Sequence, residues 1–332
     1  MFNRHSTPDT PEHGTVLLLQ IPRTNEKKEL AAEQMFASLH GLLADKNSRQ
    51  RISCEIAVKN RRIGFYVWVP DHLKSFVEEQ IYAQYPDVHI TEVPDYIEID
   101  PSPGTALLGA ELKLTAHEAL PIKTFPSFEV DPLAAITATL AQFEEHEEAW
   151  LQVIIKPAQD TWYKKSERYA SSIRTGNTRT NFVGLLWTPP ETKSDAPKLA
   201  EFESARANAA EEKSHKLAYE VTMRAIYRGQ TTTTQARMRL QAITATFKQF
   251  NSTYLNGFTQ LYIDNSQFLH AFQDRALSKK GFVLNIEEIA SLYHLPHTNV
   301  ETPNILWASA KTAEPPANLP VYSDANTTEI SP

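Results

Sequence analysis

The chain has 332 residues, of which 41% are hydrophobic and 22% are charged, the composition of an ordinary globular protein. This length favours two domains over a single core. The net charge of −7 argues against a protein that binds nucleic acid through an overall basic surface, although a local basic patch is compatible with it.

The first α/β unit is predicted over residues 14–94, after a polar N-terminus (1–13) that we expect to be disordered. Its pattern predicts a strand (15–21), a helix (30–43), a hairpin of two alternating strands (52–58 and 63–69), a helix (73–81) and a strand (88–90). Asp71 precedes the second helix and is a candidate cap for it. The order βαββαβ is that of ferredoxin-like folds.

A similar pattern of strands and helices is predicted over residues 105–264, after a predicted linker (95–104) rich in proline. Strands are predicted at 106–114 and 127–130, and Asp131-Pro132 is a strong helix start. A strand (150–155), a polar insertion (159–213), a strand (217–227), a helix with threonine caps (231–234) and a strand (258–263) follow. Without the insertion, this is a second ferredoxin-like unit.

The end of the chain differs in composition. Residues 265–310 are predicted to be helical, with Asn285 and Glu288 as a capping box, and residues 311–332 form a Pro-rich linker or tail. The predicted fold class is therefore α+β: two ferredoxin-like units in tandem, the second with a helical, basic insertion, followed by a small C-terminal helical segment and a tail.

The sequence lacks the common catalytic and cofactor motifs. Gly104 and Gly109 have the spacing of a Walker A motif, but Ala110 and Glu111 follow where Lys and Ser or Thr are required. The acidic run at 144–148 is expected to be the solvated end of a helix and its turn. We therefore predict no catalytic residue and no cofactor.

Histidine and cysteine give no clear site either. His294 and His297 lie three residues apart, which could suit a metal, but Pro296 interrupts the helix between them. Packing and hydrogen bonding at a helix end is the favoured interpretation, so we predict no metal. Cys54, the single cysteine, occupies an alternating strand position and is expected to be a packed core thiol. One cysteine is typical of a reducing compartment.

One stretch supports a binding hypothesis on physical grounds. Cations that can contact phosphates alternate there with rings that can stack on bases. The candidate nucleic-acid residues are Trp162, Lys164, Lys165, Arg168, Tyr169, Arg174 and Arg179. The alternative is a solvated basic helix with Trp162 and Tyr169 packed inward. The neighbouring apolar run 182–187 is expected to be a buried strand, with an oligomer contact or a membrane-surface contact left open.

Several segments resemble the N-terminal region of bacterial type IV secretion, or conjugal DNA-transfer, ATPases. The resemblance runs from about residue 15 to 320 and is carried by LAAEQMFASLHG (30–41), FYVWVPDHLKSFVEEQIYAQYPD (65–87), ELKLT (111–115), PIKTFPSFEVDPLAAITA (121–138), RLQAITATFKQFN (239–251) and LNIEEIASLYHLPHTNVETPNILW (284–307). In that family the region precedes a RecA-like motor domain of the FtsK/HerA kind, which carries the Walker motifs. This sequence ends before any such motor, so no catalytic residue carries over.

The resemblance implies a non-catalytic module that helps to assemble a ring and docks onto a partner or membrane complex. Its expected partners are other copies of itself, a RecA-like motor domain, DNA and a peripheral membrane complex. A single-stranded nucleic-acid-binding module is the alternative, and an enzyme with an unrecognised site is a third. With no signal peptide and no apolar run of the roughly 18 residues that a spanning helix needs, we expect a cytoplasmic location, with a place at the inner membrane left open.

Overall fold

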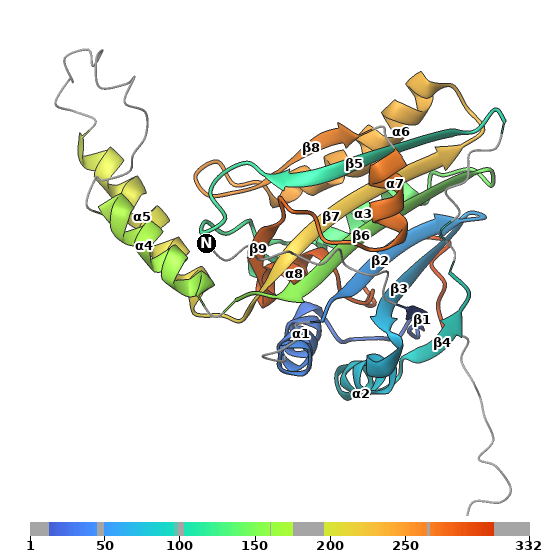
Figure 1. The fold of residues 1–332 in the computed structure, drawn as a ribbon, viewed down its shortest axis with the longest axis horizontal. Helices are drawn as coiled ribbons and strands as arrows, with labels where there is room; N and C mark the ends of the chain where they lie inside the picture. The colour runs from blue at the N-terminus through green and yellow to red at the C-terminus, as the bar shows by residue number, and fades with distance from the viewer. Residues whose placement is uncertain are drawn as a thin grey trace, which may run out of the picture.

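The structure, a computed structural model, describes residues 13–44, 50–95, 97, 103–159, 161–174, 196–263 and 266–308. The first unit contains β1 (Gly14–Gln20), α1 (Glu29–Leu43), β2 (Ile52–Lys59), β3 (Arg62–Pro70), a 3-10 turn (Asp71–Leu73), α2 (Lys74–Gln84) and β4 (His89–Val93). These antiparallel strands lie in the order β4-β1-β3-β2 (Figure 1), which is the ferredoxin-like arrangement that the sequence predicted.

The second unit repeats this arrangement in mirror order. It contains β5 (Ala106–Leu114), a 3-10 turn (Phe125–Ser127), α3 (Pro132–Leu140), β6 (Glu147–Pro157), β7 (Ala218–Gly229), α6 (Thr233–Thr246), a 3-10 turn (Phe247–Phe250) and β8 (Phe258–Ile263). Its strands lie in the order β6-β7-β5-β8. Two helices of the predicted insertion, α4 (Trp162–Arg174) and α5 (Ala196–Ser214), lie between β6 and β7.

The two units share one continuous sheet. Strand β2 of the first pairs antiparallel with β6 of the second, with Glu55 opposite Gln152 at the middle of the contact. The main hydrophobic core also draws on strands and helices from both units. The α+β class is thereby confirmed, and the units form one packed body.

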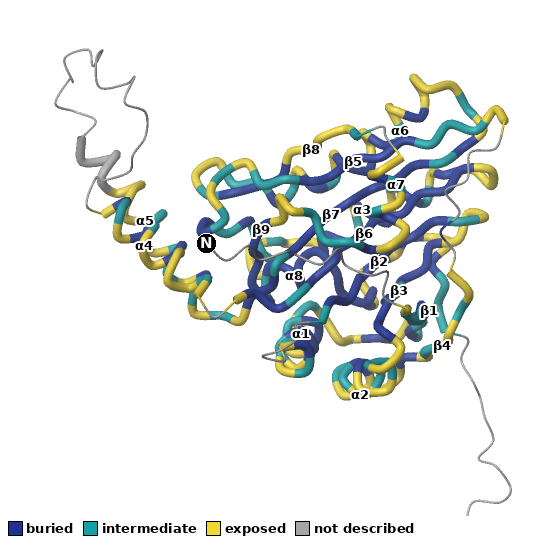
Figure 2. Tube along the Cα trace, in the orientation of Figure 1, coloured by how far each residue is buried: buried dark blue, intermediate teal, exposed yellow. Residues whose placement is uncertain are grey.

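Side chains alternate between the two faces of the sheet, as a pleated strand requires. The apolar residues of α1, α2, α3 and α6 cover one face, and Figure 2 shows the resulting band of buried strands. On the other face α7 (Ser266–Gln273) places Phe268 and Phe272 against Trp150 and Ile226.

The C-terminal segment crosses both units. It adds a short strand, β9 (Phe282–Asn285), which pairs with β7 and which the sequence did not reveal, and then α8 (Ile286–Leu292). The predicted capping box is present: the Asn285 side chain accepts from the Glu288 backbone N–H at 2.9 Å, and the Glu288 side chain accepts from that of Asn285 at 2.8 Å. Beyond α8 the chain returns to the first unit, where Ile305 bridges to Ile63.

Two predicted local features are wrong. Residues 127–130 form no strand: Ser127 ends the 3-10 turn, and residues 128–130 lead to Asp131. The Asp131 carboxylate caps α3 by accepting from Leu133 N–H at 2.7 Å. Asp71 does not cap a helix. Its carboxylate instead accepts a hydrogen bond from the Thr15 hydroxyl at 2.7 Å.

The acidic run matches the solvated helix end that we expected only in part, at the exposed Glu144 and Glu145. Glu147 and Glu148 are buried because β6 begins at Glu147. Tyr227 and Arg239 both donate to the Glu147 carboxylate, at 2.8 and 3.0 Å, and Arg228 lies 3.2 Å from that of Glu148. The sequence could not reveal these partners, because they come from β7 and α6.

Some predictions fall on residues outside the described part of the chain: the N-terminal residues 1–12, Arg179, the apolar run 182–187 and the tail 311–332. Within the described part, no helix combines the length and apolar character needed to span a bilayer.

Candidate functional site at the root of a helical arm

Helices α4 and α5 form an antiparallel pair, which we call the helical arm, that extends away from the sheet (Figure 1). Small side chains of the two helices, with Ile173, make their apolar seam, and this seam continues into Ala119 and Leu120 of the body. Most other side chains of the described arm are exposed (Figure 2). The arm therefore presents a long accessible surface on a packed base.

A buried lysine fixes the base of the arm to the body. Lys213, near the end of α5, is 0% exposed, and its ammonium group lies 3.0 Å from the Glu288 carboxylate, itself 0% exposed. The same ammonium donates to the carbonyl oxygens of Glu118 at 2.7 Å and Val283 at 2.9 Å. We call this set of contacts the arm root.

Glu288 is equally well satisfied. It accepts from the backbone N–H of Ile122 at 2.9 Å and, through the capping box, from that of Asn285. Burial raises the pKa of Glu288 and lowers that of Lys213, while the opposite charge of each partner counteracts the shift. Such a pair adds little net stability but is strongly destabilising to break, so the arm root fixes where the arm leaves the body.

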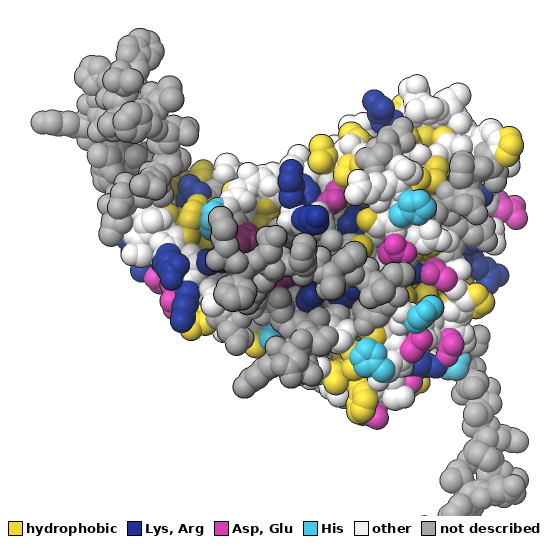
Figure 3. Space-filling view, viewed as in Figure 1, with side chains coloured by type: hydrophobic (Ala, Val, Ile, Leu, Met, Phe, Trp, Pro, Cys, Tyr) yellow, Lys and Arg dark blue, Asp and Glu magenta, His cyan; other side chains and the backbone are white. Residues whose placement is uncertain are grey.

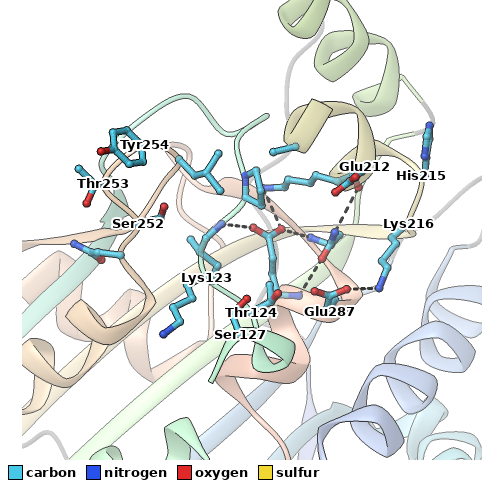
Figure 4. Close-up of a pocket in the computed structure, with 18 residues that line it drawn as sticks. Lys123, Thr124, Ser127, Glu212, His215, Lys216, Ser252, Thr253, Tyr254 and Glu287 are labelled. Atoms are coloured by element: carbon cyan, nitrogen blue, oxygen red, sulfur yellow. Dashed lines mark hydrogen bonds and ion pairs between the residues drawn. The ribbon is translucent and has the colours of Figure 1, made fainter. Parts of the chain in front are cut away.

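A polar cavity of about 850 Å³ lies beside the arm root (Figure 4). Lys216 bridges Glu33 of α1, at 2.7 Å, and Glu287 of α8 at its edge. Lys123 lies over the ring of Phe128, 4.1 Å from its centroid. Hydroxyl groups complete the lining: Thr124, Ser127, Ser252, Thr253 and Tyr254. Because carboxylates stand beside its lysines, this cavity is not the concentrated positive site that a phosphate group requires.

The loop that lines this cavity also contacts the arm. Tyr254 stacks on Phe202 of α5 with ring centroids 4.4 Å apart. Both rings remain accessible, with 55% and 41% of their surface exposed. This stacked pair is an exposed aromatic feature where the arm meets the body.

The predicted nucleic-acid residues divide into two groups. Trp162 and Tyr169 are partly buried: Trp162 packs on Ala158, Ala218 and Val283, and Tyr169 stacks on His117 at 4.1 Å. Arg174 is engaged with Glu211 and donates to Asn208 at 2.8 Å.

The other predicted cations, Lys164, Lys165 and Arg168, are exposed on one side of α4. Figure 3 shows basic and acidic side chains side by side on the described part of the arm. The alternative interpretation, a solvated basic helix, predicted that Trp162 and Tyr169 pack inward, and they do. Among the predicted residues that the structure describes, these three cations are exposed together, with Tyr163 beside them.

Sequence reasoning missed the arm root. Lys213 belongs to a charged run at the end of α5 that has the composition of a solvated helix end, and Glu288 is 75 positions away along the chain. The one available signal was the capping box. It placed Glu288 at a helix start but did not reveal its ion pair with Lys213.

No curated protein sequence matches the chain. A family model described as "Domain of unknown function (DUF8128)" matches residues 8–308, which is nearly the entire chain. The protein therefore belongs to the DUF8128 family.

Proposed function

We propose that this chain is a non-catalytic module of a type IV secretion or conjugative DNA-transfer motor. It takes part in assembling the motor ring and docks onto a RecA-like motor protein, on the cytoplasmic side and next to the membrane complex. The observation that carries the proposal is the helical arm, an exposed helix pair held at its base by a buried ion pair.

The form of the arm supports a docking role. A hairpin of two helices exposes long side chains on several sides, whereas a buried root keeps its direction constant. The Phe202–Tyr254 pair adds an exposed aromatic patch at the base of the arm, and aromatic residues are enriched among the anchors of protein interfaces. Residues 284–307, which carry part of the resemblance to the secretion motors, include Glu288 of the arm root.

Co-purification with the motor tests this proposal. The partner used is a RecA-like motor protein that carries a Walker A motif. We expect Phe202→Ser with Tyr254→Ser to reduce its capture at least tenfold. Tyr82→Ser is the matched control, because Tyr82 is a comparably exposed aromatic residue on α2. Capture that is unchanged in the double variant and lost in the control would refute docking through the arm.

A second variant tests the arm beyond its root. Joining Arg174 to Ala207 through a short Gly-Ser loop removes residues 175–206, including Phe202, and retains Lys213 and its partners. We expect this variant to fold with the wild-type circular dichroism spectrum of its sheet, and to be defective in secretion or DNA transfer in cells. Transfer at the wild-type rate would contradict the proposal, as would magnesium-dependent ATP hydrolysis by the chain alone.

Single-stranded nucleic-acid binding remains the second candidate, favoured by the exposed cluster of Lys164, Lys165 and Arg168. Three phosphate contacts predict a slope of about −2 for log K against log salt on single strands. Lys165→Glu with Arg168→Glu should abolish most of this slope, whereas Lys28→Glu, an exposed lysine elsewhere, should leave it unchanged. If oligonucleotide binding is absent at low salt, this candidate is excluded.

A further inference from the structure

Four side chains that can ligate a metal converge away from the arm. Glu29 is the first residue of α1, Asp131 is the N-cap of α3, and His294 and His297 follow α8. One ligand atom from each lies within 4.8 Å of those of the other three. The side chains of Asp131, His294 and His297 are 1%, 0% and 2% exposed, so this group is buried in the body.

The spacing of these atoms is close to that of a coordination shell. Zinc binds imidazole nitrogen and carboxylate oxygen at about 2.0–2.2 Å, and the edges of such a tetrahedron are about 3.3 Å long. Nε2 of His294 lies 3.1 Å from Asp131 Oδ1, and Nε2 of His297 lies 2.9 Å from Asp131 Oδ2. Glu29, at the partly exposed start of α1, is the ligand with room to move inward.

The hydrogen bonds of His294 show which ring nitrogen faces the group. Its Nδ1 lies 2.8 Å from the carbonyl oxygen of Ala290, which can only accept, so Nδ1 carries a proton. If the His294 ring is neutral, its Nε2 then carries no hydrogen. The lone pair of Nε2 would face the Asp131 carboxylate, which is also an acceptor. A cation must lie between them. A ring N–H donated to a backbone carbonyl is also the usual way in which a protein orients a metal-binding histidine.

His297 distinguishes a metal ion from a proton. Its Nε2 is buried and lies 2.9 Å from Asp131 Oδ2, so a second imidazole nitrogen faces the carboxylate that His294 faces. A proton between His294 and Asp131 would serve only one of these two nitrogens. It would also leave two carboxylates beside each other with only one compensating charge. A divalent ion satisfies both imidazoles and balances both carboxylates.

Metal binding requires one local change. Nδ1 of His297 accepts from the N–H of Asn299 at 3.3 Å, and this nitrogen must carry the ring proton when Nε2 binds a metal. The bond that is lost is longer than the usual range for such contacts, and the Asn299 N–H must turn away from the protonated Nδ1.

We propose that Glu29, Asp131, His294 and His297 bind one zinc-class divalent transition-metal ion. Imidazole and carboxylate ligands suit zinc, and four protein ligands leave no open position, which is typical of a structural ion. The ion would join three distant parts of the chain: the first helix of the first unit, the first helix of the second unit and the segment after α8. This inference does not depend on the proposed function of the arm.

Metal analysis of the full chain, purified without chelator from zinc-supplemented cells, tests the proposal. We expect close to one zinc per chain, and retention of zinc by His89→Gln, which changes an exposed histidine on β4. His297→Gln and Asp131→Asn should lose it; Asn retains the capping ability of position 131. Chelation should lower the melting temperature by about 5 °C or more, and added zinc should restore it.

Cobalt provides a readout that does not depend on stability. The apoprotein with one equivalent of cobalt should show the visible absorption of four-coordinate Co²⁺, and His297→Gln should not. A chain without bound transition metal, whose melting temperature responds to neither chelator nor zinc, would overturn the proposal. Metal that the His297→Gln and Asp131→Asn variants retain in full would overturn it as well, because the ion would then be bound elsewhere.

Discussion

Replacing Lys213 by methionine is the most informative perturbation of the arm root. Methionine has a similar length and no charge, so the variant removes the ammonium group with little change in packing. It leaves the Glu288 carboxylate charged in a fully buried position and removes the donor from the carbonyl oxygens of Glu118 and Val283. Loss of one member of a buried ion pair typically destabilises a protein by about 3–5 kcal/mol.

That free energy corresponds to a fall in melting temperature of roughly 5–15 °C for a body of this size. The double variant Lys213→Met, Glu288→Gln should recover a large part of it, because no uncompensated charge remains buried. The glutamine oxygen can still accept from the Ile122 N–H. We therefore expect a coupling free energy of about 2 kcal/mol between the two positions.

The effect should also depend on pH. Burial already raises the pKa of Glu288, and removing the lysine raises it further. Protonation of Glu288 on acidification then neutralises the unpaired charge in the folded state. The destabilisation by Lys213→Met should accordingly be larger at pH 8 than at pH 5.5, measured by urea unfolding at both values. Lys28→Met, at an exposed position, is the control. A loss below about 1 kcal/mol at both pH values, or additive effects in the double variant, would refute the buried-pair account.

Three further predictions concern the body. Burial raises the pKa of Cys54, so a thiol reagent should label it only in urea; rapid labelling of the native chain would contradict its packing. A Cβ at Gly109 would lie 2.0 Å from the ring of Phe268, so Gly109→Ala should destabilise the folded chain by about 1–3 kcal/mol. Gly41 has open space around it, so Gly41→Ala should not destabilise the chain. Thermal unfolding measures both variants. Arg61 has φ of 59° in the β2–β3 turn, so Arg61→Gly should stabilise by up to about 1 kcal/mol; a lower melting temperature would contradict this.

The ferredoxin-like units could be predicted because their signals are local. Alternation over 52–58 and 63–69, helical spacing in α1 and the cap at Asp131 each act within a few residues. The structure confirms the two strands, the helix and the cap, although β2 is buried on both faces. The prediction failed where partners are distant. Glu147 and Glu148 have the composition of a solvated turn until the strand and helix that supply Tyr227 and Arg239 are in place.

The contacts that hold the parts together could not be predicted in this way. Pairing of β2 with β6 joins two strands separated by nearly a hundred residues, and periodicity does not indicate which edges meet. The basic insertion shows the same limit on a smaller scale. Its cations and rings can be named from the sequence, but their partners cannot: His117 stacks on Tyr169, and Glu211 engages Arg174.

Hydrogen–deuterium exchange of the full chain, with and without the RecA-like motor protein, tests most directly whether the arm is the docking element. We predict that the motor slows exchange in residues 162–174 and 196–214 and leaves residues 74–84 of α2 unchanged. Slower exchange at α2 and β4, with none in the arm, would contradict the account.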